Sequence, residues 1–303
     1  MQVKELLRNG GFEEGTKWWL FVRGPYGMPP RGWAEAGKLA RIVMDDVHSG
    51  KRALMLDARG LDHEVDVHSE PFAIEPNRFY RLSSFVKQIA GTGRYKVVID
   101  WRDAHGKHIR YDNDWRGVNR PKNFAFHGGI FRAPENARQA IVLLGVAKGV
   151  ACIFDDISLV MYPPHPSGVA ESVRDGEGRA TLRIEPAGDV TVGSYRTFRI
   201  IFTVGKSGLP VGSAIQFRRS NVEVRWSQPQ VDVPDGDGFL TVRASNGAEL
   251  FVECGNWHAV PQLTTIRIGY PPLRHGDVIE IIYGDKSRGG KGARVQPVAE
   301  RGG

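Results

Sequence analysis

Short runs of β-forming residues, separated by turn residues, recur along the whole chain and constrain its fold most strongly. In the first half the runs cover residues 52–56, 63–68, 79–87, 95–101, 140–146 and 152–159. In the second half they cover residues 180–185, 197–204, 214–218, 239–244, 250–254, 264–268 and 278–283. Because no stretch shows a sustained helical period, this pattern predicts an all-β protein made of two β-sandwiches.

A proline-rich segment separates the two sets of strands. Residues 161–168 read Met-Tyr-Pro-Pro-His-Pro-Ser-Gly, and proline both removes backbone donors and stiffens the chain. A chain of 303 residues is long enough for two domains of ordinary size. We therefore predict a first domain at 1–162, a linker at 163–172 and an accessory β-sandwich at 173–303.

Composition and charge argue against several classes of function. The net charge of +7 is modest, and basic residues alternate with acidic ones along most strands. Nucleic-acid binders concentrate basic residues on one face or tail, so we predict no nucleic-acid partner. No run of about 18 apolar residues is present to span a membrane, and the first residues lack the apolar stretch of a secretory signal. We expect this chain to be a fragment of a longer protein that is secreted or lies at the cell surface.

Three short motifs, far apart in the sequence, are rich in potential oxygen ligands. They are Asn-Gly-Gly-Phe-Glu-Glu-Gly at 9–15, His-Ser-Gly-Lys-Arg-Ala-Leu at 48–54 and Phe-Asp-Asp-Ile-Ser-Leu at 154–159. Hard cations such as calcium take six to eight oxygen ligands from carboxylates and carbonyls. The motifs therefore indicate a metal ion that closes the first domain, unless Glu13 and the two aspartates only face water.

The order of motifs in residues 5–160 resembles carbohydrate-binding modules of the family 4, 9 and 22 type, within the galactose-binding-like jelly rolls. The resemblance rests on the three motifs above together with Gly-Trp at 32–33, Ser-Glu-Pro-Phe at 69–72, Asn-Arg-Phe-Tyr-Arg-Leu-Ser at 77–83, Asp-Ala-His-Gly-Lys at 103–107 and Phe-Arg-Ala-Pro-Glu-Asn-Ala at 131–137. It implies a jelly roll that binds polysaccharide without catalysis and holds a structural calcium. The implied metal positions are Gly11, Glu13, His48, Lys51, Asp155 and Asp156, and we favour Asp155 over Asp156.

Sugar binding requires flat apolar surface for the ring faces and planar polar groups for pairs of hydroxyls. The loop at 16–33 places many aromatic residues among glycine and proline, more than a strand can bury. We predict a stacking platform formed by Trp18, Trp19, Tyr26, Trp33 and, from a later loop, Trp115.

Alternation along the strands sorts the polar candidates. In residues 95–102 every second side chain shares a face, so Trp101 should lie in the core while Asp100 and Arg102 point outward. After a hairpin turn at Asp103–Lys107, the same rule turns Ile109 and Tyr111 inward and His108, Arg110 and Asp112 outward. These charges form either a sugar-binding cleft or cross-strand ion pairs on an exposed sheet. Arg102 and Arg110, with Arg116, would suit an acidic glycan, since guanidinium pairs a carboxylate bidentately.

The second half resembles a β-domain that precedes a phosphoesterase-like catalytic region in bacterial proteins of unknown function. The resemblance rests on Trp-Ser-Gln-Pro-Gln at 226–230, Gly-Phe-Leu-Thr-Val at 238–242 and the segment at 276–297. We therefore predict a non-enzymatic pair of modules that brings a tethered catalytic domain to its polysaccharide. The alternatives are a protein-interaction scaffold, or a glycosidase or polysaccharide lyase that uses Asp100 and Asp112.

Overall fold

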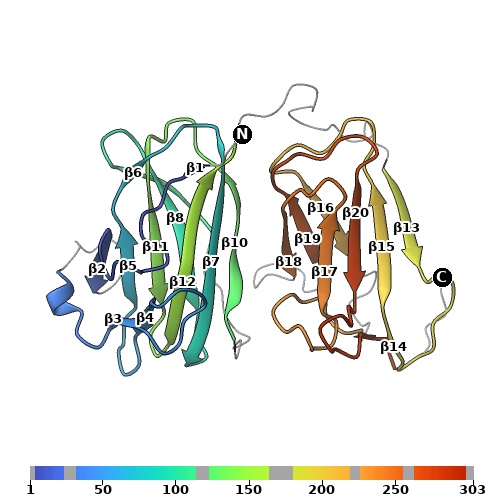
Figure 1. Cartoon of the computed structure of the whole chain (residues 1–303), viewed down its shortest axis with the longest axis horizontal. Coiled ribbons are helices and arrows are strands. Elements are labelled where there is room, and N and C mark those ends of the chain that lie inside the picture. Colours follow the sequence, from blue (N-terminus) through green and yellow to red (C-terminus); the bar gives the residue numbers. More distant parts are fainter. Residues whose placement is uncertain are drawn as a thin grey trace. The chain divides into compact units, whose positions relative to one another are not determined.

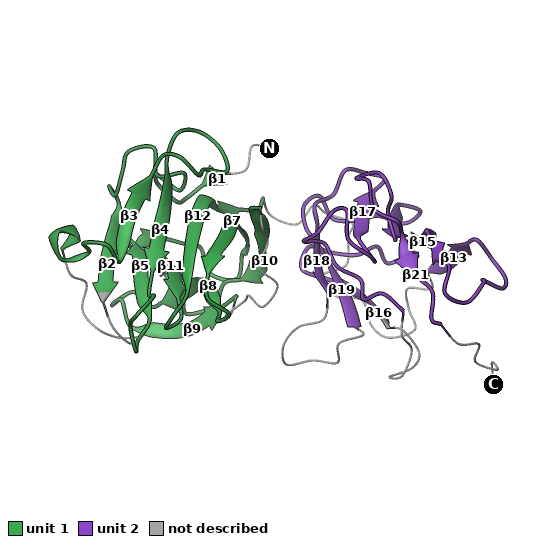
Figure 2. Cartoon of the chain, turned by 90° about the horizontal axis from the view of Figure 1, so that it is seen from below, with its two compact units in different colours: residues 1–163 green, residues 164–303 purple. Residues whose placement is uncertain are grey.

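The computed structural model describes residues 4–23, 32–113, 123–163, 180–218, 226–254 and 263–297 (Figure 1). The chain divides into two compact units, residues 1–163 and 164–303, which Figure 2 shows in separate colours. Apart from one 3₁₀ turn, η1 (Trp33–Glu35), every regular element of the described residues is a β-strand, which confirms the all-β prediction. Within these same ranges no helix combines the length and apolarity needed to cross a membrane. The predicted linker, from residue 164 onward, lies outside the described residues.

The first unit is a jelly-roll sandwich of two six-stranded antiparallel sheets. The first sheet has the order β10-β7-β12-β4-β3, with β1 beside β12, and its strands are β1 (Lys4–Glu5), β3 (Ala40–Val43), β4 (Ala53–Asp57), β7 (Phe79–Ala90), β10 (Ala125–Arg132) and β12 (Ala151–Met161). The second sheet has the order β2-β5-β11-β8-β9, with β6 beside β11, and its strands are β2 (Trp19–Arg23), β5 (Val65–Ser69), β6 (Phe72–Ala73), β8 (Tyr95–Arg102), β9 (His108–Asp112) and β11 (Gln139–Val146).

The core of the first unit lies between these sheets and follows the two-residue period of a strand. Side chains of β7 alternate between buried and half-buried along nearly its whole length. Leu82 and Phe154 contribute from the first sheet, and Val97 and Trp101 from the second, all of them fully buried. The two facing sides of the sheets are therefore packed together, and a smaller buried apolar cluster lies on the opposite side of each sheet.

Strand β10 is the main element that the sequence pattern does not predict. Its sequence, Ala-Phe-His-Gly-Gly-Ile-Phe-Arg, contains a Gly-Gly pair that usually marks a turn. The neighbouring strand explains the pair: a Cβ at Gly128 would lie 2.2 Å from the Leu82 carbonyl oxygen. Glycine is thus needed because β10 approaches β7 closely.

The described residues of the second unit form a core of their own and three sheets. Their strands are β13 (Thr181–Glu185), β15 (Phe198–Thr203), β20 (Val278–Tyr283) and β17 (Leu240–Ala244) in the order β13-β15-β20-β17; β16 (Ala214–Arg218), β19 (Leu263–Ile268) and β18 (Leu250–Cys254) in the order β16-β19-β18; and β14 (Tyr195–Arg196) paired with β21 (Ala293–Arg294). The runs predicted at 214–218, 250–254 and 278–283 coincide with β16, β18 and β20. Ile266, Ile279 and Ile281 lie at the centre of the core.

Candidate functional site

The outward side of the second sheet of the first unit, here called the outer face, gathers the polar candidates. Along β8, Tyr95, Val97, Ile99 and Trp101 belong to the core, so Lys96, Val98, Asp100 and Arg102 share the outer face. The prediction that Trp101 is a core residue is confirmed, since it is fully buried. The placement of Asp100 and Arg102 on the opposite side of the sheet also agrees with the alternation.

Asp100 organises a fixed polar group, here called the Asp100 cluster, with Arg102, His108 and Tyr111. Its carboxylate is fully buried, and its Oδ2 accepts a 2.8 Å hydrogen bond from Arg102 Nε. The other carboxylate oxygen lies 2.7 Å from His108 Nδ1. The His108 ring in turn stacks on Tyr111, with 3.9 Å between ring centroids. Two planar polar groups and one phenol ring are thereby held in place on an accessible sheet face.

The predicted orientation of β9 is confirmed for Ile109, which packs against the core, and is wrong from Arg110 onward. The pairing places Tyr111 opposite Asp100 on the outer face, and Arg110 opposite Trp101 on the core side. Asp112 is also on the core side. Its Oδ2 accepts a 2.8 Å hydrogen bond from Trp101 Nε1 and forms an ion pair with Arg110. The cause is a register irregularity between Trp101 and Arg102, because one extra residue at a bulge exchanges the two faces of a strand.

Two consequences follow from this reversal. Asp100 and Asp112 point to opposite sides of the sheet, so they do not flank a common bond as the glycosidase alternative requires. The predicted preference for an acidic glycan also loses the support of Arg110, because this residue is not on the outer face. Arg116 lies outside the described residues. Arg102 remains, but its charge is paired with Asp100.

A second buried charged group, which the sequence reasoning missed, lies on the same outer face. Lys96 Nζ is 2.8 Å from Asp66 Oδ2 and 3.3 Å from Glu64 Oε2, and both Lys96 and Asp66 are almost entirely buried. Gly145 on β11 makes room for this pair, since a Cβ there would lie 2.1 Å from Asp66 Oδ1. The alternation of β8 predicts that Lys96 lies on this face. Its partner Asp66 is on β5, and the sequence alone does not show that the two residues meet.

A small buried apolar cluster adjoins the charged groups. Val98, Ile141 and Leu143 form a small buried cluster on the outer face of β8 and β11. His68 from β5 is paired in register with Leu143. All three apolar side chains are at most 5% exposed, so the accessible part of the outer face is the Asp100 cluster, where Arg102, His108 and Tyr111 reach solvent.

The two buried groups Asp66 and His68 should give this unit opposing pH dependences. Burial raises the pKa of Asp66 to about 7 despite Lys96, and burial, with Lys96 and Arg102 nearby, lowers the pKa of His68 to about 3. The Asp66 contribution to the free energy of unfolding therefore falls as pH rises from about 4 to about 7. The His68 contribution falls as pH decreases from about 6.5 toward 3, because the unfolded imidazole then binds a proton that the folded one does not.

Single substitutions should expose each dependence. We expect His68→Gln, which keeps Asp66, to be more stable at pH 5 than at pH 7. We expect Asp66→Asn, which keeps His68, to be less stable at pH 5 than at pH 7. In each variant the free energy of unfolding should change by at most about 1.4 kcal/mol per pH unit. Urea unfolding at pH 5, 6 and 7 measures both. Equal slopes in the two variants would contradict this assignment.

The predicted aromatic platform is only partly present. Trp19 is 2% exposed, packs against Phe12 and donates its indole N–H to the Asn9 carbonyl, so its prediction as a stacking residue is wrong. Trp33 is half-buried against the core and donates its indole N–H to the Trp19 carbonyl at 2.8 Å. Tyr26 and Trp115 lie outside the described residues.

Trp18, like Trp33, is partly exposed. It lines a cavity of about 490 Å³ together with residues from β1, β6 and the adjoining segments. Its ring already contacts two cations: the Arg8 guanidinium carbon lies 4.5 Å, and Lys17 Nζ 5.0 Å, from the ring centroid. A sugar that stacked on Trp18 would have to compete with these side chains.

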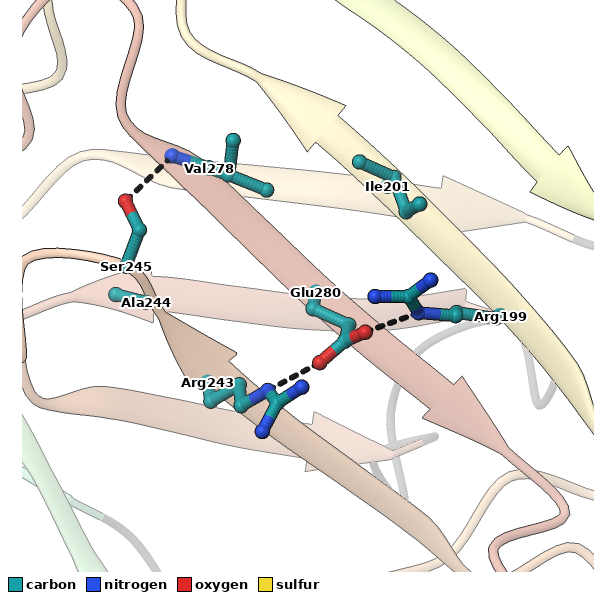
Figure 3. Close-up of a pocket in the computed structure, with 7 residues that line it drawn as sticks. All are labelled: Arg199, Ile201, Arg243, Ala244, Ser245, Val278 and Glu280. Carbon is teal, nitrogen blue, oxygen red and sulfur yellow. Dashed lines mark hydrogen bonds and ion pairs between the residues drawn. The ribbon is translucent and has the colours of Figure 1, made fainter.

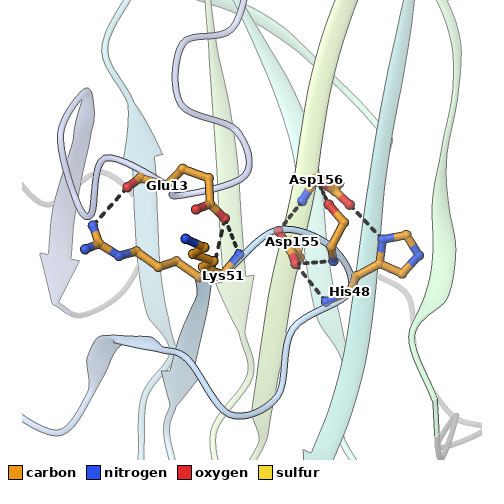
Figure 4. Close-up of polar contacts among 7 residues, drawn as sticks. Glu13, His48, Lys51, Asp155 and Asp156 are labelled. Atoms are coloured by element: carbon orange, nitrogen blue, oxygen red, sulfur yellow. Dashed lines mark hydrogen bonds and ion pairs between the residues drawn. The ribbon is translucent and has the colours of Figure 1, made fainter.

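The three ligand-rich motifs meet beside the middle of β12 and form what we call the clasp, residues 9–13, 48–52 and 155–156 (Figure 4). Glu13 Oε1 accepts hydrogen bonds from the backbone N–H groups of Lys51 and Arg52, at 2.7 and 3.1 Å. Asp155 Oδ2 accepts them from His48 and Ser49, at 2.8 and 3.2 Å. The two carboxylates thus hold opposite ends of one loop.

The two aspartates of the clasp have different surroundings. Asp155 is fully buried, and its Oδ1 accepts the N–H of Asp156 at 2.7 Å. Burial raises its pKa, although the three backbone N–H groups act in the opposite direction. Asp156 is partly exposed and bonds to side chains, namely His48 Nδ1 at 2.7 Å and Ser49 Oγ at 2.8 Å.

The donor set of the clasp contains few side-chain ligands for a metal. Within the described ranges no group of three or more His, Cys, Asp or Glu side chains is arranged to hold an ion. Gly11 is close to the aspartates, since a Cβ there would lie 3.5 Å from Asp156 Oδ1 and 4.0 Å from Asp155 Oδ1. A calcium ion here would need carbonyl and water oxygens to complete its coordination, which this hard cation accepts.

No protein-family model matches the chain. Among curated proteins it is 26% identical over 166 residues to the tRNA nuclease WapA of Bacillus subtilis (strain 168), a match that covers 51% of this chain and 7% of that protein. It is also 26% identical over 147 residues to the tRNA3(Ser)-specific nuclease WapA of Bacillus spizizenii, covering 46% of this chain and 6% of that protein. The chain thus spans less than a tenth of the length of these relatives.

Among solved structures, the chain is similar to two carbohydrate-binding modules. One is described as a family 16 carbohydrate-binding module, with 18% identity and a TM-score of 0.37 over 51% of this chain and 98% of that one. The other is the CBM22-1 xylan-binding domain of Xyn10C from Paenibacillus barcinonensis, with 16% identity and a TM-score of 0.38 over 53% of this chain and 97% of that one. Family 22 is one of the families that the motif order in residues 5–160 resembles.

Proposed function

We propose that residues 1–163 form a non-catalytic carbohydrate-binding module that binds a polysaccharide on the outer face. The observation that carries the proposal is the Asp100 cluster, in which a buried carboxylate fixes Arg102 and His108 beside the ring of Tyr111. Fixed planar donors pair with vicinal hydroxyls at little entropic cost, and the exposed phenol ring offers a face for C–H contacts.

Within a longer protein, such a module would bring a tethered catalytic domain to an extracellular polymer. Binding to the polymer raises the local concentration of the tethered enzyme near its substrate without any new chemistry in this chain. The reversal of β9 supports the absence of a catalytic role, because it separates the two carboxylates that hydrolysis would use. Secretion and the tethered domain are parts of this proposal.

We further propose that calcium binds at the clasp. The support is the burial of Asp155 beside Gly11 and the convergence of Asp155 and Glu13 on the loop at 48–52, through the N–H groups of His48 and Lys51. Such an ion would stabilise the join between the ends of the first unit and leave the outer face unchanged.

The binding proposal predicts that Tyr111→Ala and Arg102→Ala each weaken retention by a polysaccharide at least about tenfold. Affinity electrophoresis in gels that contain a neutral polymer, xylan or galactan, measures this after a glycan array has identified a ligand. Arg59→Ala is the matched control, because Arg59 is also paired with an aspartate, Asp57, but lies beyond β4 in the other sheet.

Two results would contradict the proposal. The first is an array on which the parent chain binds no glycan. The second is a neutral glycan that the parent binds and that Tyr111→Ala and Arg102→Ala bind equally well. Tyr111 is 39% exposed, so its replacement tests binding without removing a core residue.

A further inference from the structure

A cavity of about 400 Å³ opens on the outward side of the sheet β13-β15-β20-β17 in the second unit (Figure 3). Strands β15, β20 and β17 and the residue that follows β17 provide its lining, which consists of Arg199, Ile201, Arg243, Ala244, Ser245, Val278 and Glu280. On β20, Ile279, Ile281 and Tyr283 belong to the core, so Glu280 points away from it. The cavity is therefore distinct from the core and lies entirely within described residues.

Glu280 holds the two arginines of this cavity in place. Its carboxylate is 6% exposed and accepts hydrogen bonds from Arg199 Nε on one oxygen and from Arg243 Nε on the other. Register explains the convergence, because Glu280 on the central strand is paired with Ile201 on one side and with Arg243 on the other. Burial opposes ionisation of Glu280, but the two arginines lower its pKa below the usual value.

The arrangement leaves positive charge facing solvent. The lining contains two arginines and one carboxylate, and so carries one net positive charge. Arg199 Nη1 is also 3.4 Å from Glu185 Oε2, so the cation available to a ligand is Arg243. The side chain of Arg243 is 73% exposed, and its Nη atoms lie beyond the Nε that contacts Glu280 (Figure 3). A guanidinium fixed through Nε can still present two parallel N–H groups to an anion.

Uncharged groups complete the cavity. The Ser245 hydroxyl accepts the Val278 N–H at 2.9 Å, which fixes the oxygen and leaves its own proton to donate. Ile201 and Val278 add apolar surface beside the arginines. A single anionic group attached to a C–H-rich ring fits this set better than a nucleic-acid backbone, which requires an extended array of cations.

We propose that this cavity binds the carboxylate of a uronic-acid residue in an acidic polysaccharide. Arg243 pairs with the carboxylate, Ser245 donates to a neighbouring oxygen, and Ile201 and Val278 contact the ring. The second unit is then a binding module in its own right. This inference is independent of the sugar site proposed for the first unit.

The test compares polygalacturonate with its fully methyl-esterified form, which has the same backbone without the charge. By isothermal titration, the whole chain should bind polygalacturonate at least about tenfold more tightly than the ester. Arg243→Lys keeps the charge but loses the paired N–H groups, and should abolish most of this preference. Arg183→Lys is the matched control, because Arg183 is 67% exposed, pairs with Glu185 and, through its pairing with Ile201, lies on the same side of the sheet.

Each outcome decides the proposal. Loss of the preference in Arg243→Lys but not in Arg183→Lys supports it, as does its persistence in Tyr111→Ala, which removes only the first unit's site. Equal binding by Arg243→Lys and the parent would overturn it, as would an equal loss in Arg183→Lys. Tighter binding of an RNA homopolymer than of polygalacturonate at this cavity, or binding of sulfate alone, would also overturn it.

Discussion

Replacing Gly10 with alanine should destabilise the first unit by at least about 3 kcal/mol, because the new methyl group would overlap backbone rather than a movable side chain. A Cβ at position 10 would lie 1.7 Å from the Ile157 carbonyl oxygen. Ile157 in turn donates its N–H to the Gly10 carbonyl at 3.0 Å, so relief of the overlap would break this bond. Thermal or urea unfolding of the chain measures the loss.

Gly32→Ala is the matched control for this prediction. Nothing lies within 4 Å of a Cβ built at Gly32, and its backbone, with φ −68° and ψ 150°, suits any residue. We expect its stability to remain within about 0.5 kcal/mol of the parent. A Gly10→Ala protein as stable as Gly32→Ala would show that the clasp segment can move away from β12 without cost.

Asp155→Asn should lower the free energy of unfolding by about 2–4 kcal/mol. The substitution replaces one carboxylate oxygen, which accepts backbone N–H groups, with an NH2 group, which can only donate. His48, Ser49 and Asp156 provide those three N–H groups, and the carboxylate is fully buried. Asp156→Asn is the control, since Asp156 bonds only to side chains and is partly exposed. Its φ of 49° is one that asparagine tolerates well, so we expect a loss below about 1 kcal/mol.

The same variants test calcium at the clasp. If calcium binds there, a chelator lowers the unfolding temperature of the parent and of Asp156→Asn, but not that of Asp155→Asn. A parent whose unfolding temperature is unaffected by both chelator and added calcium would contradict the calcium proposal. Asp155 would then act through its N–H bonds alone, and its substitution would still be costly.

Much of the clasp follows from the sequence motifs once each residue is given a physical role. Asn9 has a left-handed φ of 52°, and its side chain bonds to the backbone of Glu14, Gly15 and Lys17. Phe12 also has positive φ and is fully buried in the core. A motif of this kind is predictable because most of its interactions are with its own neighbours in sequence.

The sugar-binding candidates were less predictable. The role of Trp19 depends on the strand that begins at it: Trp18 has a φ of 72°, and the chain then enters β2 with Trp19 turned into the core. A loop rich in aromatics and glycine contains no periodic signal that separates buried rings from exposed ones. Tyr111 was assigned to the core for a related reason, because strict alternation cannot anticipate a bulge.

The sequence by itself determined the all-β class, most strand positions and the inner and outer faces of β8, because these depend on the two-residue period of a strand. It also determined the hairpin at residues 103–107, where Gly106 takes a φ of 78°. Only the tertiary structure decided which charges meet. Lys96 forms an ion pair with Asp66 across Gly145, and Glu280 forms ion pairs with Arg199 and Arg243. These pairs depend on the register of strands that are far apart in the chain. Register is set by packing between sheets and by bulges, and neither leaves a local mark in the sequence.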